Sequence, residues 1–344
     1  MTKPWLLVAM IFLSPAFCAA KQPMVAHNPV STFSIVARDP ATGQMGIAVA
    51  SRYFSVGSVV PWAEAEVGAV ATQADVNVGY GPKALALLRQ GLTAQQVADK
   101  LLAEDTFPGK DGRQFAIVDA KGNVVTYTAP NAPNWAGGEK SATWAAQGNI
   151  LVGPQVPEAM GKAFETTKGE LAEKLFAALK AGDAAGGDKR GHQSASMLIV
   201  GKQCGRNTNN DRYLYINVDD SADPFSELRR LLDTALAYNY GDRAYKLLED
   251  KKITEAKLAA ESAVRYSPNN SDSHLDLGFL DYLAGDKAAA LQEFLTARKL
   301  DPNFRKQWDA EISYEKAFEP ILRDKEFLKQ LFPDKAGKDE TGKD

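Results

Sequence analysis

Short apolar segments that alternate with polar residues characterise the first part of the chain. Thr32–Ala37 alternates and is rich in β-branched residues, which predicts a strand. A turn-forming cluster at Asp39–Gly43 separates it from the apolar segment Met45–Ala50, so the two are expected to form a hairpin. Val67–Gln73 predicts a third strand of the same kind.

Helical periodicity then alternates with further strands. Gly81-Pro82 begins one predicted helix, which Gly91 closes, and Thr93 is suited to cap the next. The remaining expected elements are a hairpin (Phe115–Tyr127), an extended segment (144–152), a helical pair (Pro157–Ala181), two strands (Ser194–Val200 and Tyr213–Val218) and a closing helix (Phe225–Tyr238). Hairpins indicate antiparallel sheets, so the first domain is predicted to be α+β, with helices outside the sheets.

From about Tyr238 onward, Ala, Leu, Lys and Glu recur at helical spacing. Pro268 and Pro302 each follow a helical segment and lie 34 residues apart, which is the tetratricopeptide period. Gly278 and Ala290 are small where two helices of one such unit would cross, and Phe294 would fill the groove between units. Residues 239–332 are therefore similar to tetratricopeptide repeats.

Two repeats alone would leave an apolar face uncovered. Trp308 lies at the phase of a third unit, and Ile321–Phe332 is expected to be a capping helix. The charged tail, 333–344, is expected to be disordered. The repeats would form either a concave surface for a peptide or protein partner, or a short helical cap packed on the first domain.

The N-terminus has the pattern of a secretory signal peptide. Lys3 precedes the apolar run Leu6–Leu13, Pro15 follows it, and Cys18-Ala19-Ala20 offers small residues for cleavage. Residues 1–20 would be removed, so the protein is expected to be exported, to the periplasm or the medium. A lipoprotein attached through Cys18 is the alternative. No other segment reaches 18 consecutive apolar residues, so no membrane span is predicted.

Charge and cysteine content exclude several classes of function. Lys and Arg total 40 against 43 for Asp and Glu, so no nucleic-acid partner is expected. Removal of the signal leaves Cys204 alone, without a partner for an intramolecular disulfide. The three His, at positions 27, 192 and 274, offer no spacing for a metal site, and no glycine-rich loop leads into a helix to hold phosphate. Neither a metal nor another cofactor is predicted.

Several blocks of the first domain carry a resemblance to a known superfamily. Thr32–Arg38, a glycine-bearing turn and Gly46–Arg52 resemble the opening of N-terminal-nucleophile (Ntn) hydrolases. The match is closer to an uncharacterised bacterial family of unknown function placed in that superfamily. It rests on Thr32–Ser51, Phe54–Ala63, Val67–Gln73, Gly187–Ala195, and Val218–Asp220 with Asp223-Pro224 and Glu227–Leu232. The resemblance implies a four-layer αββα sandwich over residues 32–238.

The same resemblance nominates Thr32 as a nucleophile that uses its own α-amine as the base. An α-amine titrates near pH 8 and is partly neutral at pH 7, whereas an internal amide cannot accept the proton. After signal cleavage residues 21–31 would still precede Thr32, as a linker or a propeptide. The chemistry therefore requires a second cut, between Ser31 and Thr32.

Other polar residues lie where a site could collect. Ser34 shares the face of Thr32, an Asn149 amide could face an oxyanion, and Arg190 could hold a carboxylate. The predicted substrate-binding residues are Ser34, Ser51, Arg52, Gln73, Asn149, Asp188, Arg190 and Gln193. Each of them could instead cap a loop. Asp188 and Arg190 could also pair with each other and so order their loop.

Two functions of different classes follow. One is an exported Ntn-type amidohydrolase or peptidase, which cleaves an amide bond in a small or peptide-like substrate. The other is a non-catalytic envelope protein, whose first domain binds a ligand while the helical repeats recruit a protein partner.

Overall fold

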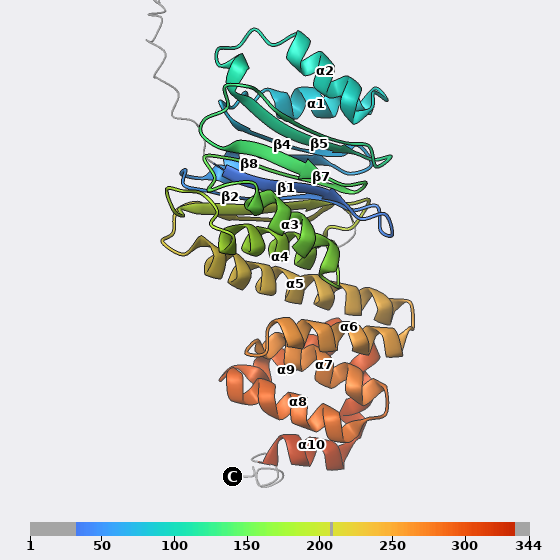
Figure 1. Ribbon diagram of the computed structural model, residues 1–344. Helices are drawn as coiled ribbons and strands as arrows, with labels where there is room; N and C mark the ends of the chain where they lie inside the picture. The colour runs from blue at the N-terminus through green and yellow to red at the C-terminus, as the bar shows by residue number, and fades with distance from the viewer. Residues whose placement is uncertain (1–31, 207–208, 334–344) are drawn as a thin grey trace, which may run out of the picture.

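The computed structural model describes residues 32–206 and 209–333. The predicted signal peptide (1–20), the linker or propeptide (21–31) and the predicted tail beyond residue 333 lie outside the described residues. The described chain is a mixed α+β part with two antiparallel sheets, followed by a helical C-terminal region (Figure 1).

The predicted strands are present, and two further strands join them. β3 (Pro61–Glu64) and β7 (Ala136–Lys140) were not predicted. β3 has only four residues, and β7 reads Ala-Gly-Gly-Glu-Lys, which lacks an apolar alternation. The described strands are β1 (Thr32–Arg38), β2 (Met45–Ser51), β3 (Pro61–Glu64), β4 (Gly68–Ala74), β5 (Arg113–Asp119), β6 (Val124–Thr128), β7 (Ala136–Lys140), β8 (Trp144–Asn149), β9 (Ser194–Val200) and β10 (Arg212–Val218).

The strands form two sheets. One has six strands in the order β10-β9-β2-β1-β8-β7, and the other has four in the order β3-β4-β5-β6. Each strand pairs antiparallel with its neighbours in these two sheets. β1 lies inside the larger sheet between β2 and β8, so both of its edges are hydrogen-bonded.

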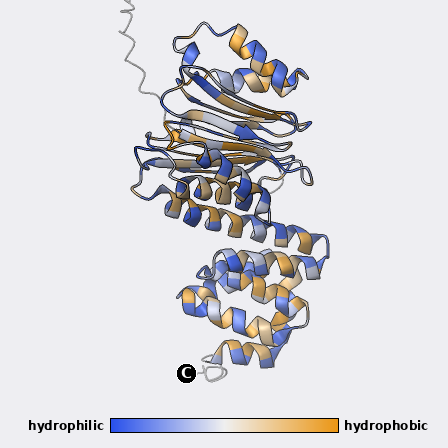
Figure 2. Cartoon of the chain, in the orientation of Figure 1, coloured by the Kyte–Doolittle hydropathy of each residue, from blue (hydrophilic) through white to orange (hydrophobic). Residues whose placement is uncertain are grey.

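Helices cover the outer faces of the two stacked sheets (Figure 1). α1 (Tyr80–Arg89) and α2 (Ala94–Ala103) pack on the smaller sheet, where Thr93 and Gln96 form a capping box at the start of α2. α3 (Gln155–Thr166) and α4 (Leu171–Ala184) pack on the larger sheet. Figure 2 shows the strands as largely hydrophobic, with hydrophilic residues gathered on loops and outer helix faces.

Alternation along β1 sends successive side chains to two different environments. Phe33 and Ile35 belong to the core beneath α3 and α4. Val36 belongs to the apolar core between the sheets. Thr32 and Ser34 share the face of Val36, so the space between the sheets becomes polar toward the start of β1.

The helical region begins with α5, a 26-residue helix that starts under the larger sheet. Asp223 caps it and Pro224 occupies its first turn. The helix continues to Glu249 rather than ending at Tyr238, so the predicted boundary at 238/239 lies inside it. The following helices are α6 (Ile253–Tyr266), α7 (Ser271–Leu283), α8 (Lys287–Leu300), α9 (Phe304–Tyr314), the 3₁₀ helix η4 (Lys316–Arg323) and α10 (Lys325–Leu331).

Packing in this region follows the small and large residues noted in the sequence. Pro268 and Pro302 lie just beyond the ends of α6 and α8. A Cβ at Gly278 would lie 2.6 Å from the Phe294 ring, so glycine allows α7 and α8 to approach. The expected capping helix at Ile321–Phe332 is divided, because its first residues belong to η4 and α10 begins only after Asp324, whose side chain caps it. Within residues 32–206 and 209–333, no helix combines the length and the apolar character that crossing a membrane requires.

Substitution of Gly278 by alanine is expected to destabilise the protein by about 1–2 kcal/mol, because the added methyl must displace the buried Phe294 ring. Gly241→Ala is the matched control. It lies inside α5, where the nearest heavy atom would be 3.9 Å from the new Cβ, and is expected to stabilise by up to about 1 kcal/mol. Urea unfolding measures both changes. Equal effects of the two substitutions would contradict the close helix crossing.

Candidate functional site

One end of the larger sheet carries a row of buried polar side chains. The register places Thr32 opposite Ser51 on one side and Asn149 on the other, and Ser51 opposite Ser194. The Thr32 hydroxyl donates to Ser51 Oγ at 3.1 Å. These four residues are at most 2% exposed.

The smaller sheet faces this row with two glutamines from adjacent strands. Gln73 Nε2 donates to the Thr32 carbonyl at 3.3 Å and to Gln114 Oε1 at 2.8 Å. Asn149 Nδ2 donates to the same Gln114 oxygen at 3.1 Å. Gln114 therefore joins Gln73 and Asn149, which come from different sheets, next to the start of β1.

A second layer of polar side chains lies one step further into the sandwich. Ser34 donates to Gln73 Oε1 at 2.6 Å. Gln147 Nε2 donates to the Ala71 carbonyl at 3.3 Å, and Gln147 Oε1 accepts from Thr126 at 3.2 Å. Beyond this layer the space between the sheets is filled by the apolar core that includes Val36.

The loops beyond the strand ends are tied together by Asp188, whose side chain is 1% exposed. Its carboxylate accepts from the Arg52 backbone N–H at 3.1 Å and from the Arg190 backbone N–H at 2.9 Å. The Arg190 guanidinium pairs with it at 3.1 Å. Arg52 in turn donates from its guanidinium to the Arg190 carbonyl at 2.7 Å. The predicted alternative for Asp188 and Arg190, an ordering pair, is thus present.

The structure brings the predicted residues to one end of the sandwich in two groups. The first group is buried and consists of Thr32, Ser34, Ser51, Gln73 and Asn149. The second group surrounds it in the loops and consists of Arg52, Asp188, Arg190 and Gln193. Within the second group, Gln193 bonds Ser51 only through its backbone, and its side chain donates to Asp220 at 3.1 Å.

Gln114, the residue with the most bonds in the network, was not predicted. It lies near the start of β5, whose pattern Arg-Gln-Phe-Ala-Ile-Val-Asp contains the only signal, a polar residue at the position where a strand enters the core. Its Nε2 also donates to Thr128 Oγ1 at 2.9 Å and to the Gly148 carbonyl at 2.8 Å.

Backbone strain accompanies the polar residues. Ala74, directly after Gln73, has φ 62°, and Ile150, directly after Asn149, has φ 55°. Non-glycine residues rarely adopt this left-handed conformation, and such strain concentrates at functional sites. The two strand ends that supply amides to the site therefore also carry an energetic cost.

The chemistry available in the described network is that of amides and hydroxyls. The partners described above for the side chains of this network are amides, hydroxyls and backbone carbonyls. Amide N–H groups can stabilise an oxyanion, but none of these side chains can take a proton from a hydroxyl near pH 7. Among residues 32–206 and 209–333, no cluster of His, Cys, Asp or Glu is arranged to hold a metal ion.

Gln114→Leu is expected to lower the free energy of unfolding by about 2–4 kcal/mol, because buried donors on Gln73 and Asn149 would lose their acceptor. Gln95→Leu is the control, since Gln95 is exposed on α2 and bonds only Asp99 there. Its expected effect is below about 0.5 kcal/mol. Chemical denaturation compares the two, and equal effects would mean that the network contributes no more than a surface amide.

Comparison with known proteins finds a matching family model and similar solved structures. The family model described as "Family of unknown function (DUF1028)" matches residues 32–228, and this range includes every residue of the candidate site. A crystal structure of a DUF1028 protein from Silicibacter pomeroyi is 29% identical, with a TM-score of 0.54, and the match covers 60% of this chain and 89% of that chain. The search of curated proteins found no match.

Proposed function

Because the chain belongs to DUF1028, a family of unknown function, we propose its activity from its own geometry: it is an exported amidohydrolase or peptidase of the Ntn type, with Thr32 as nucleophile. The observation that carries this proposal is the position of Thr32. It opens β1 at the polar end of two stacked sheets, where a hydroxyl, amides and strained strand ends converge. The two sheets with helices on both outer faces agree with a four-layer αββα sandwich.

The proposed chemistry uses two groups of one residue. Once the peptide bond before Thr32 is cut, its α-amine is the group able to accept the hydroxyl proton, since the side chains around it are amides and hydroxyls. Thr32 Oγ1 then attacks the substrate carbonyl, the C–N bond breaks, and the leaving amine takes the proton. Water hydrolyses the resulting ester, which releases the acid and restores Thr32.

The surrounding amides have assigned roles in this proposal. Asn149 Nδ2, on β8 beside the start of β1, would donate to the oxyanion. Gln73 donates its amide hydrogens to the Thr32 carbonyl and to Gln114, and would hold the start of β1 in place. Gln114 positions both through its Oε1. Arg52 and Arg190 lie in the loops outside the strand ends, where a substrate carboxylate would enter.

The proposal requires processing, because Thr32 is 0% exposed in the full chain and its amine is part of a peptide bond. The test is the N-terminal sequence and intact mass of the protein purified from the cell envelope. A mature start at Thr32, with release of amine from a panel of N-acyl and peptide amides, is the expected result. A chain made to begin at Thr32 is the matched sample for the same panel.

A start at Lys21, combined with no turnover by the chain that begins at Thr32, would overturn the enzymatic proposal. The protein would then be the exported ligand-binding or scaffold protein of the second hypothesis. In either case we propose that the helical region is of tetratricopeptide type. The phase of Gly278, Phe294, Pro268 and Pro302 supports this assignment.

A further inference from the structure

A cavity lies far from Thr32, between the α+β part and the helical region. It has a volume of about 810 Å³, within the range of small-molecule sites. The β1–β2 turn contributes Thr42 and Gln44, the β9–β10 loop contributes Gln203–Arg206, and the rest of the wall comes from α5, α7, α9 and their neighbours. We call this cavity the interdomain cleft.

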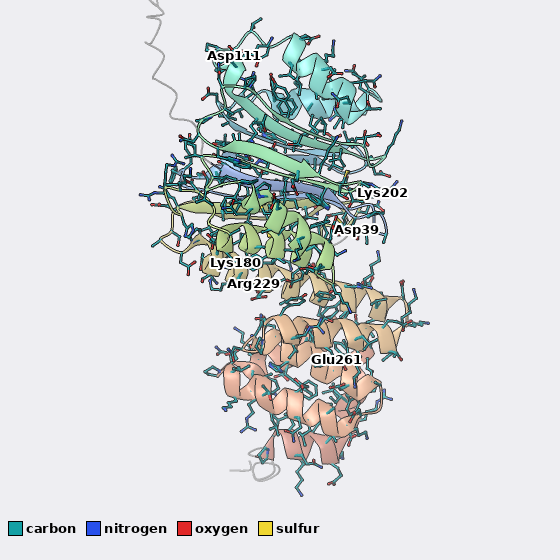
Figure 3. All side chains as sticks on the ribbon, in the orientation of Figure 1. Asp39, Asp111, Lys180, Lys202, Arg229 and Glu261 are labelled. Atoms are coloured by element: carbon teal, nitrogen blue, oxygen red, sulfur yellow. The ribbon has the colours of Figure 1, made fainter. Side chains whose placement is uncertain are left out.

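The interdomain cleft lies at the opposite end of the larger sheet from the candidate site. β1 begins at Thr32 and ends at Arg38, so about 20 Å of strand separates the two. In Figure 3, Asp39 in the β1–β2 turn and Lys202 in the β9–β10 loop lie on the same side of the α+β part, above the end of α5. A ligand in the cleft would therefore be separate from the Thr32 chemistry.

The charge on the cleft wall is strongly one-sided among the described residues. Three basic residues line it, namely Arg206, Arg243 and Lys246. The carboxylates that line it are Glu170, Asp242, Glu249, Asp272, Asp276, Glu311 and Glu315. Among the described ion pairs, only Asp242 of these seven has a partner, Arg206 at 3.0 Å. The wall thus carries seven carboxyl groups against three basic side chains, of which Arg243 lies near enough to Glu170 to act against the rise of its pKa.

The centre of the cleft holds one phenol between two carboxylates. Tyr245 donates to Asp276 at 2.7 Å and lies 2.5 Å from Glu311. One hydroxyl proton can bond only one of the two carboxyl groups at a time, so the other must hold a proton of its own or pair with a cation. Burial and the nearby Glu311, Asp272 and Asp242 raise the pKa of Asp276 to about 8, although the bond from Tyr245 acts to lower it.

A second phenol–carboxylate cluster lies in the same cleft. Glu170 accepts from Tyr213 at 2.5 Å and from Tyr240 at 3.2 Å. Burial raises the pKa of Glu170, against these two hydrogen bonds. The cleft therefore has two separated anionic points joined by aromatic walls, which favour cations through their ring faces.

The kind of cation follows from this spacing. No group of three or more acidic, His or Cys side chains in the described chain is arranged to hold a metal ion, so the carboxylates are spread along the cleft rather than converging on a point. The volume is also far larger than a bare ion needs. We propose that the interdomain cleft binds a linear alkylammonium, with two or more positive charges along an aliphatic chain, as in a free polyamine or a lysine-bearing peptide.

Calorimetric titration of the full chain tests this proposal with three organic probes and with MgCl₂. The organic probes are spermidine, the peptide acetyl-Gly-Lys-Gly-Lys-Gly-amide and its analogue with norleucine at both lysine positions. Spermidine or the lysine peptide is expected to bind at least about tenfold more tightly than the uncharged norleucine peptide and than MgCl₂. The better of the two charged probes identifies the source of the alkylammonium.

Variants locate the binding. Glu311→Gln and Asp276→Asn keep an oxygen that can accept from Tyr245 but cannot carry the negative charge that a bound cation needs, and each is expected to weaken binding about tenfold. Glu261→Gln is the control, because Glu261 is exposed on α6 outside the cleft (Figure 3) and its loss should leave affinity unchanged. A thermal midpoint no lower than that of the wild type shows that each variant is folded.

Proton release gives a readout that a structural role would not produce. Asp276 faces Tyr245 and Asp242 from α5, Asp272 from α7 and Glu311 from α9. A cation bound there favours the ionised carboxylate, so titrations at pH 7 in buffers of different ionisation enthalpy should detect protons released by wild type and fewer by Asp276→Asn. Equal affinity for the charged and norleucine probes, or unchanged affinity in both cleft variants, would overturn the proposal, whatever the outcome at Thr32.

Discussion

Thr32→Ala, made in a chain that begins at residue 32, is expected to lower amide hydrolysis by at least about a thousandfold. The substitution removes the hydroxyl that attacks the carbonyl but leaves the α-amine and the backbone pairing of Thr32 with Ser51 and Asn149. Steady-state release of amine from the best substrate of the amide panel measures the loss. A residual rate within tenfold of the parent would remove Thr32 as the nucleophile.

Two variants separate the nucleophile from its surroundings. Thr32→Ser keeps an attacking hydroxyl and is expected to retain measurable turnover. Ser34→Ala removes the hydroxyl two residues along the same face, which bonds Gln73 at 2.6 Å, and should lower the rate far less than Thr32→Ala. If Ser34→Ala were inactive while Thr32→Ala kept its activity, the assignment of Thr32 as the nucleophile would be wrong.

Arg113→Met is expected to lower the free energy of unfolding by about 3–5 kcal/mol, because it leaves a buried carboxylate without its cation. The Arg113 side chain is 1% exposed and pairs with Asp105 at 2.9 Å, whose side chain is also 1% exposed. Its guanidinium also donates to the carbonyls of Asp75, Phe107 and Pro108. Denaturant unfolding at pH 7 measures the loss.

The control for this substitution is Arg89→Met. Arg89 pairs with Glu64 on the surface, with side chains 57% and 36% exposed, and such pairs contribute about 0–1 kcal/mol. An equal loss for Arg89→Met and Arg113→Met would show that burial of the Arg113 pair has no energetic consequence.

The Arg113 pair also predicts a pH dependence. Burial acts to raise the pKa of Asp105, but hydrogen bonds from Tyr80 and Arg113 outweigh it and hold that pKa below its ordinary value. A carboxyl with a lowered folded-state pKa stabilises the fold above its unfolded pKa and loses this contribution as the pH falls through the folded value. The difference in stability between wild type and Arg113→Met should therefore shrink in acid.

Arg113 connects this stability to the candidate site. The register pairs Ala74 with Arg113 and Gln73 with Gln114. One face of this strand pair therefore carries the buried Arg113 side chain, and the other face carries the amides of the candidate site. The guanidinium bond to the Asp75 carbonyl lies directly after the strained Ala74. The contacts of the Arg113 guanidinium thus stabilise the backbone conformation that Gln73 needs in order to reach Thr32.

Local patterns determined much of the secondary structure. The β-branched alternation of Thr32–Ala37, the turn at Asp39–Gly43 and the Thr93 cap depend on residues close in sequence, and each is found as predicted. The same holds for the prolines beyond α6 and α8. Local steric and hydrogen-bonding preferences are properties of short segments, so they can be recognised without the rest of the chain.

Long-range pairing decided the elements that the sequence did not reveal. β7 contains two glycines and two charged residues, and it is a strand because β8 supplies its hydrogen bonds. The length of α5 is likewise a tertiary result, because its first half packs under the sheet while its second half begins the helical region, and Gly241 within it breaks neither.

The candidate site shows the same division. The sequence by itself identified Ser51 at a strand end and Asn149 in an extended segment, because polar positions stand out within apolar strands, and the resemblance to Ntn hydrolases nominated Thr32. Only the tertiary structure decided that Gln114 joins Gln73 to Asn149, and that Asp188 serves the loops after β2 and β8. These contacts join residues far apart in the chain, and their geometry depends on how two sheets stack, which local sequence preferences do not specify.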